Sequence, residues 1–139
     1  MTDIIRKDTD YAMRVLVYLA LNDNEKPVAT KILAQTQDIP LDFIYKILRK
    51  LTHAEFVTSK MGMRGGFKLS REPAQIKFLD VVSAIQGPVI LRTCCLDLEA
   101  CPRRKNCNVS KKLGELQESL LRSLSKITLA EILQEKNKK

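Results

Sequence analysis

Apolar positions recur at intervals of three and four residues through the first part of the chain. They include Tyr11, Val15, Tyr18 and Leu19, with smaller apolar residues beside them. This spacing gathers the apolar side chains on one face and predicts a mostly buried helix over residues 4–21. The polar stretch Asn22-Asp23-Asn24 is expected to end this helix.

Two shorter helical patterns joined by a turn follow. The first covers residues 29–35 and directs Ile32 and Leu33 inward. The turn covers residues 37–40, because a proline such as Pro40 suits the first turn of a helix but not its interior. The second helix has apolar positions at Ile44, Ile47, Leu48 and Leu51, and its other face carries Asp42, Tyr45, Lys46, Arg49 and Lys50. Short paired helices, the second basic on its outer face, are typical of a helix-turn-helix.

A two-stranded hairpin is predicted directly after the helix-turn-helix. Residues 56–60 and 67–70 are rich in β-formers, and the tip between them contains three glycines. The stretch from Lys46 to Arg71 holds seven basic residues against Glu55 alone, a local net charge of +6 out of +8 for the whole chain. Such concentrated charge favours a DNA-contacting surface over a merely solvated basic face. The predicted fold is mostly α: a winged helix-turn-helix with a two-stranded wing.

The second half of the chain predicts further amphipathic helices. Residues 78–85 form a short one that ends at Gly87-Pro88, and residues 109–125 form a long one. The apolar stripe of the long helix is Leu113, Leu116, Leu120, Leu124 and Ile127. A small winged helix has little free surface for so long a stripe, so a homodimer interface is favoured over packing within one chain. Thr128-Leu129-Ala130-Glu131 has the capping-box pattern of a last short helix.

The chain is therefore expected to have three parts. Residues 1–88 form the DNA-binding domain, 89–108 a cysteine-rich cluster-binding loop, and 109–139 the C-terminal dimerisation helix with its tail. No apolar run approaches the roughly 20 residues of a membrane span. The first residues lack a signal-peptide pattern, so a cytoplasmic protein is expected. An enzyme is the least favoured class, because the only histidine is His53 and no catalytic dyad or phosphate-binding glycine loop is present.

All four cysteines lie between positions 94 and 107, namely Cys94, Cys95, Cys101 and Cys107. In a reducing compartment, such thiols are more often ligands or redox groups than structural disulfides. Five residues separate each of the last three from the next, and a loop can wrap three such side chains around one centre. Zinc prefers closely paired cysteines, whereas iron–sulfur clusters accept wider spacings, so an iron–sulfur site is favoured.

Two other functions stay open on the residues alone. Cys94 or Cys95 can form a disulfide with Cys101 or Cys107, which gives a thiol–disulfide redox regulator of the same fold without a cluster. Alternatively, the basic face binds RNA or a partner protein, as in an assembly protein.

Several stretches together resemble the Rrf-two superfamily of bacterial transcription regulators, with its IscR-type and NsrR-type members. The resemblance covers nearly the whole chain. The matching stretches are Thr9-Asp10-Tyr11-Ala12-Met13-Arg14, Ile39-Pro40-Leu41-Asp42-Phe43-Ile44, Gly62, Arg64-Gly65-Gly66-Phe67, Leu69 and the cysteines Cys95, Cys101 and Cys107.

The resemblance implies a homodimer on a double-stranded DNA operator, with a cluster on the loop that senses redox state, nitric oxide or iron–sulfur supply. IscR-like members place a histidine three residues after the third cysteine, where this chain has Ser110. NsrR-like members use an acidic residue of the partner's first helix, which matches Asp10. Asp10 and Cys94 are thus rival fourth ligands, and Asp10 is equally expected to be an ordinary exposed helix carboxylate or part of a salt bridge. A [4Fe–4S] cluster is favoured and a [2Fe–2S] cluster is the alternative.

On DNA, Tyr45, Lys46 and Arg49 are expected to face base edges in the major groove, while Lys50 and Lys60 hold phosphates. Arg64 at the hairpin tip is expected to enter a minor groove. Thr30 is expected to touch only the DNA backbone. Members of the family often carry an arginine before the first wing glycine, where this chain has Met61, and this departure bears on the operator sequence.

Overall fold

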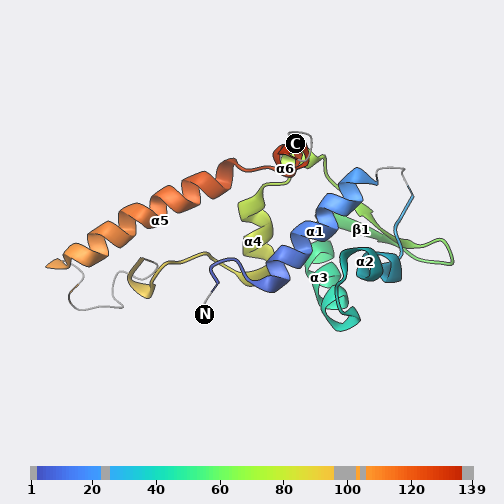
Figure 1. The fold of residues 1–139 in the computed structure, drawn as a ribbon, viewed down its shortest axis with the longest axis horizontal. Helices are drawn as coiled ribbons and strands as arrows, with labels where there is room; N and C mark the ends of the chain where they lie inside the picture. Colours follow the sequence, from blue (N-terminus) through green and yellow to red (C-terminus); the bar gives the residue numbers. More distant parts are fainter. Residues whose placement is uncertain (1–2, 23–25, 96–102, 104–105, 136–139) are drawn as a thin grey trace.

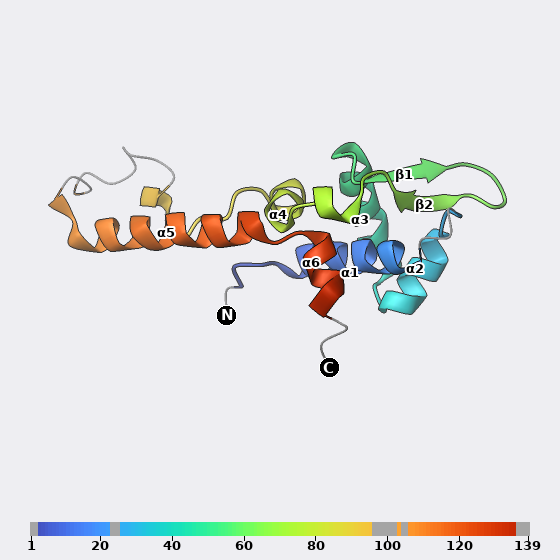
Figure 2. The same cartoon turned by 90° about the horizontal axis from the view of Figure 1, so that it is seen from above.

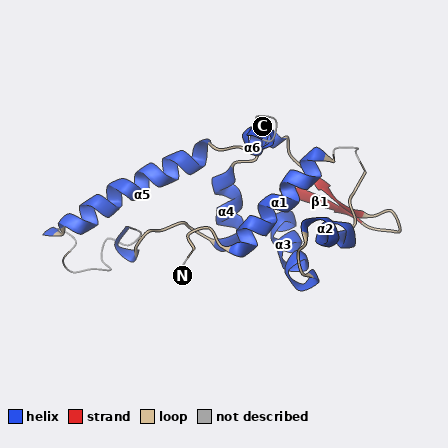
Figure 3. Ribbon diagram, in the orientation of Figure 1, coloured by secondary structure: helices blue, strands red, loops and turns tan. Residues whose placement is uncertain are grey.

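The computed structural model describes residues 3–22, 26–95, 103 and 106–135. Within them, the helices are accompanied by a single two-stranded antiparallel sheet, which lies at the end of the molecule opposite α5 (Figures 1 and 3). The elements are α1 (Lys7–Leu21), α2 (Thr30–Gln37), α3 (Leu41–His53), β1 (Val57–Lys60), β2 (Gly66–Leu69), α4 (Phe78–Gln86), α5 (Asn108–Lys126) and α6 (Leu129–Glu135). Short 3-10 turns, η1 (Pro73–Gln75) and η2 (Thr93–Cys95), lie before and after α4. The predicted mostly α fold with a two-stranded wing is confirmed.

Helix α1 lies at the centre of the hydrophobic core and packs against α2, α3, α4 and α6. Its predicted apolar face is buried, as Val15 and Leu16 are fully enclosed. The helix begins at Lys7, three residues later than the sequence predicts, because the preceding residues bond elsewhere. The side chain of Gln86 binds the carbonyl of Ile4 and the amide of Arg6.

The helix-turn-helix forms where the sequence predicts it. In α3, Ile44, Ile47, Leu48 and Leu51 are all buried, as expected. The turn closes with Asp38 in the left-handed region at φ 54° and with Ile39 buried. The inward orientation expected for Ile32 is wrong, since Ile32 is 45% exposed while Leu33 and Ala34 are buried. The inner face of this two-turn helix holds only these two neighbours and turns Ile32 toward solvent.

The wing is fixed to the rest of the domain at its root. Strands β1 and β2 pair from Val57 with Leu69 to Lys60 with Gly66. Val28, just before α2, exchanges backbone hydrogen bonds of 2.8 and 2.9 Å with Phe67. Gly66 allows this close approach, because a Cβ at that position would lie 2.3 Å from the carbonyl oxygen of Val28. The wing thus has a backbone contact with the segment that begins the helix-turn-helix.

Helix α5 extends away from the winged helix, toward the side opposite the wing (Figure 2). Its C-terminal half packs on α4, where Leu120, Leu121 and Leu124 surround Val82 and Val89. The chain then turns back, and α6 buries Leu129 completely in the main core. Residues 129–135 therefore pack against the winged helix in space, although they follow the long helix in sequence. None of the helices within the described residues is long and apolar enough to cross a membrane.

Candidate nucleic-acid interface and cysteine site

The outer face of α3 presents the polar side chains that the sequence singles out for DNA. Tyr45 is 54% exposed, and Lys46 and Arg49 are exposed beside it. This follows from the helical period, because the buried residues occupy the opposite face. Thr30 begins α2 and is half-buried. The side chains expected at base edges therefore share one solvent-facing surface.

Helix α1 holds α3 in place through an aromatic contact. The ring of Tyr11 meets that of Phe43 edge to face, with centroids 5.9 Å apart. The guanidinium of Arg14 lies over Tyr11, 5.3 Å from the ring centroid. It also pairs with Asp10 at 2.7 Å and donates to the carbonyl of Gln37 at the end of α2. These residues connect α1 to both helices of the helix-turn-helix.

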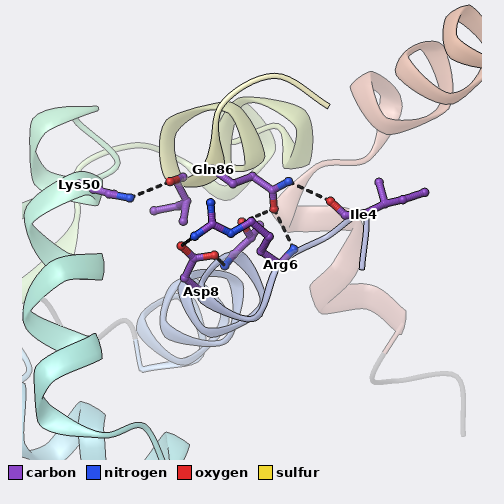
Figure 4. Close-up of polar contacts among 7 residues, drawn as sticks. Ile4, Arg6, Asp8, Lys50 and Gln86 are labelled. Atoms are coloured by element: carbon purple, nitrogen blue, oxygen red, sulfur yellow. Dashed lines mark hydrogen bonds and ion pairs between the residues drawn. The ribbon is translucent and has the colours of Figure 1, made fainter. Parts of the chain in front are cut away.

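The end of α4 is the meeting point of three segments (Figure 4). Lys50 of α3 donates from Nζ to the carbonyl oxygen of Ile85 at 2.8 Å. Gln86 Oε1 accepts from the Arg6 amide at 2.9 Å and from the hydroxyl of the fully buried Thr9 at 2.7 Å. Its Nε2 donates to the carbonyl of Ile4 at 2.8 Å. Hydrogen bonds thus join α4 both to α3 and to the N-terminal segment. Neither Thr9 nor Gln86 stands out for this role in the sequence.

Arg6 adds a cation that the sequence analysis missed. It pairs with Asp8 at 3.1 Å. Together with Lys46 and Lys50 it lines a hollow of about 210 Å³ beside α3. Nothing in the local sequence indicates this placement, because Arg6 precedes α1 and reaches the surface of α3 only through the fold.

The wing carries two of the expected DNA contacts, whereas the half-buried Arg71, just after β2, binds within the domain. Lys60 ends β1, Arg64 lies at the tip, and both are exposed. Arg71 instead donates to the carbonyl of Ala54 at 3.0 Å. Its guanidinium lies over the ring of Phe56, 4.8 Å from the centroid. Arg71 therefore caps the end of α3 rather than extending the basic surface.

Two of the four thiols lie on a common hollow. Cys94 and Cys107 are free, half-buried cysteines and line a cavity of about 960 Å³ between η2 and the start of α5. Cys107 is the N-cap of α5, and its sulfur accepts from the amide of Ser110 at 3.4 Å. Cys101 and the side chain of Cys95 lie outside the described residues. Cys94 and Cys107, which flank the loop in sequence, thus border one hollow, and thiolates are ligands that soft metals prefer.

Gln117 joins residues 89–91, which lead into the cysteine loop, to α5, and its role was not predicted from the sequence. The side chain is 6% exposed. It accepts from the amide of Leu91 at 2.7 Å and donates to the carbonyl of Val89 at 2.6 Å. The available indication was a lone glutamine four residues after Leu113, within the apolar stripe. Gln117 thereby sets the path of the chain that leads to Cys94.

Asp10 lies on α1 and is not among the residues that line the cysteine hollow. Within this chain its carboxylate pairs with Arg14, and it is exposed. No group of three or more histidine, cysteine, aspartate or glutamate side chains comes together as a metal site within the described residues.

A helix-turn-helix with a basic outer face, followed by an anchored β-hairpin, defines a winged-helix DNA-binding protein. The family model of Rrf2, described as an iron-dependent transcriptional regulator, matches residues 5–135. The chain belongs to this Rrf2 family, as the sequence resemblance implies. Its members are transcription regulators that bind DNA and act as dimers, not enzymes.

Individual relatives agree with this assignment. The chain is 31% identical over 125 residues to Protein rrf2 of Nitratidesulfovibrio vulgaris, covering 90% of this chain and 83% of that protein. IscR of T. potens has a TM-score of 0.72 and 26% identity, over 94% of this chain and 86% of that one. CymR, the global cysteine regulator of B. subtilis, has a TM-score of 0.78 and 23% identity, over 96% and 98% of the two chains. At 23% identity, the likeness to CymR shows only a shared fold.

Proposed function

We propose that the chain acts as a homodimer that docks on an operator through α3 and the wing. Tyr45, Lys46 and Arg49 face base edges in the major groove, because they share the exposed face of the second helix. Lys50 and Lys60 bind phosphates, and Arg64 enters the adjacent minor groove. Thr30, at the start of α2, contacts the DNA backbone.

We further propose that the cysteine loop holds an iron–sulfur cluster. The observation that carries this proposal is that the free thiols of Cys94 and Cys107 line one hollow from opposite ends of the loop. Thiolates are the ligands that such clusters take. Cys95, Cys101 and Cys107 would bind it, with Cys94 or Asp10 of the partner subunit as the fourth ligand. When bound, a [4Fe–4S] or [2Fe–2S] cluster supplies redox chemistry and reactivity toward nitric oxide.

The chain's own contacts provide a route from the loop to the DNA surface. Gln117 fixes residues 89–91 to α5. Two residues upstream, the chain passes through Gly87 into the end of α4, where the carbonyl of Ile85 binds Lys50. A change in the path of residues 87–94 would therefore alter the position of α4 against α3. Such a shift between two arrangements is what a regulatory switch requires.

The same two thiols favour a second candidate function. A pair of free cysteines on one hollow suits a thiol–disulfide regulator, in which Cys94 or Cys95 joins Cys101 or Cys107 under oxidation. This alternative requires no metal, and disulfide formation would change DNA affinity through the same DNA-binding surface.

Anaerobic purification, followed by iron and acid-labile sulfide assays per subunit, tests the cluster. About four of each support a [4Fe–4S] site, and about two of each a [2Fe–2S] site. Cys107→Ser should abolish the iron, whereas Cys94→Ser and Asp10→Ala identify the fourth ligand. If the anaerobically purified protein contains no iron and loses DNA affinity when treated with thiol oxidants, the disulfide mechanism is supported and the cluster is refuted.

Removing the cluster is expected to leave the fold intact. Among the residues that the structure describes, the two core clusters, of the winged helix and of the α4–α5 contact, contain no cysteine. Chelation should therefore change DNA affinity while the far-UV circular dichroism stays nearly constant. A large loss of helical signal on iron removal would contradict this expectation.

A further inference from the structure

The wing tip exposes two methionines far more than any other large apolar residue of the described chain. Met61 is 92% and Met63 is 106% exposed, whereas the next, Val109, is 65% exposed. Both stand on a hairpin tip that projects away from the core (Figure 2). Two large apolar side chains exposed to water two residues apart on a protruding element indicate a binding surface rather than a scattered surface residue.

The backbone of the tip presents these side chains in a tight turn. The amide of Gly65 donates to the carbonyl of Gly62 at 3.0 Å, which places Met63 and Arg64 at the two central positions. Gly62 adopts a φ of 109°, and a Cβ on Gly65 would lie 2.1 Å from the carbonyl oxygen of Lys60. The two glycines therefore allow a fold-back that leaves a methionine and an arginine side by side at the apex.

We propose that Met61 and Met63 form an apolar wedge that inserts from the minor groove between base pairs of the operator and bends the duplex. The inference deepens the proposed docking of the wing and rests on it. Apolar wedges of this kind partly unstack a base step, and the bend then brings more DNA against the protein. The thioether is flexible and polarisable, which suits contact with the face of a base.

The charges around the methionines favour DNA as the occupant. Lys60 precedes Met61, Arg64 follows Met63, and both cations are exposed. An apolar surface of a partner protein would bury these charges without partners, whereas a narrow minor groove attracts them. Backbone hydrogen bonds between Val28 and Phe67 hold the base of the wing against the domain, so Met61 and Met63 project from an anchored hairpin.

A wedge gives sequence preference without hydrogen bonds to bases. Pyrimidine–purine steps unstack most easily. The operator should therefore favour a TA or CA/TG step beneath each wing, next to the groove that takes Arg64. This preference would depend on Met61 and Met63 and not on the outer face of α3.

The test begins with a duplex enriched from a random-sequence library by the full-length wild-type protein. Fluorescence energy transfer between the ends of this duplex measures the bend, and 2-aminopurine at successive steps reports unstacking. The paired replacement Met61→Gln with Met63→Gln keeps side-chain length but removes the apolar character. It should lower the bend and the 2-aminopurine signal and weaken binding roughly tenfold, with the salt slope unchanged.

The matched control is Met61→Leu with Met63→Leu, which retains an apolar wedge and should retain most of the bend. Arg64→Ala should instead reduce the salt slope. Equal bends and equal 2-aminopurine signals for wild type and the glutamine pair would overturn the wedge while DNA binding stands. Failure to enrich any duplex would refute the proposed docking itself. Because both positions are exposed, the variants should fold normally, and far-UV circular dichroism checks this.

Discussion

Polar side chains inside this small protein hold its segments in register. Thr9 is fully enclosed and Gln117 nearly so, yet each has hydrogen-bond partners. Within the described residues, no buried side-chain nitrogen or oxygen lacks a partner. Buried polar groups cost little when paired and much when one partner is removed. Replacing such a residue should therefore destabilise the protein by leaving a polar group unpaired, not by opening a cavity as in the apolar core.

Gln117→Leu should destabilise the protein by about 1–3 kcal/mol, because the half-buried amide of Leu91 and the buried carbonyl of Val89 lose their partner. Urea unfolding followed by circular dichroism measures the change. Glu118→Leu, the same new side chain at an exposed neighbouring position, should change stability by less than about 0.5 kcal/mol. Equal stability of the two variants would show that Gln117 does not hold the loop.

Lys50→Ala should weaken binding to every duplex and lower the magnitude of the salt slope by about one. The reason is that Lys50 lies on α3 beside the exposed basic residues, although its Nζ meets the carbonyl of Ile85 in the free protein. Affinity measured across salt concentrations is the readout. Lys126→Ala, at the end of α5, serves as the control for a charge of the same sign away from the interface. A lower stability with an unchanged salt slope would mean that Lys50 acts only by holding α4.

At the scale of elements, the helix-turn-helix and the wing could be predicted because short-range rules decide them. The period of Ile44, Ile47, Leu48 and Leu51 determines the buried face of α3. The Thr128 hydroxyl caps α6 as predicted, accepting from the amide of Glu131 at 3.1 Å.

The features that sequence did not predict depend on contacts between distant segments. The start of α1 at Lys7 depends on Gln86, about 80 residues away along the chain. Arg71 counts as surface charge in the sequence but binds the end of α3. Of the cysteines expected as cluster ligands, Cys94 and Cys107 have described side chains, and spacing alone does not identify the fourth ligand. The DNA-contact assignments stay predictions, which the variants above test.

Gly66→Ala should destabilise the wing and weaken DNA binding. A Cβ at this position would lie 2.3 Å from the carbonyl oxygen of Val28, and the backbone has a φ of 156°. The wing would have to separate from the segment before α2, and the pair of Val28–Phe67 hydrogen bonds would be strained. Amide hydrogen exchange at Phe67 should accelerate.

Gly114→Ala makes the same chemical change within α5, where nothing lies within 4 Å of the added Cβ. It should stabilise the protein by about 0.5–1 kcal/mol, as expected for a glycine in a helix interior. If Gly66→Ala left stability and the exchange rate at Phe67 unchanged, the root of the wing would not be as close to Val28 as described.

At the scale of the whole molecule, the two halves of α5 have different environments. The C-terminal half covers Val82 and Val89, which is the packing within one chain that the apolar stripe also allowed. The N-terminal half projects beyond the winged helix (Figure 1) and exposes Val109 and Leu116 by 65% and 58%. Unburied apolar residues on a projecting helix are what the proposed homodimer would cover.

Leu116→Glu should therefore convert the dimer to a monomer without unfolding the chain. The side chain is already 58% exposed, so the charge costs little in the monomer, but it would be desolvated in an interface between two copies of α5. Sedimentation equilibrium measures the oligomeric state, and DNA affinity should fall at least tenfold, because one winged helix then binds without its partner. Glu118→Lys changes charge on the opposite side of the helix and should leave the dimer intact. A Leu116→Glu protein that stays dimeric would place the interface elsewhere and leave the exposed half of α5 to another partner.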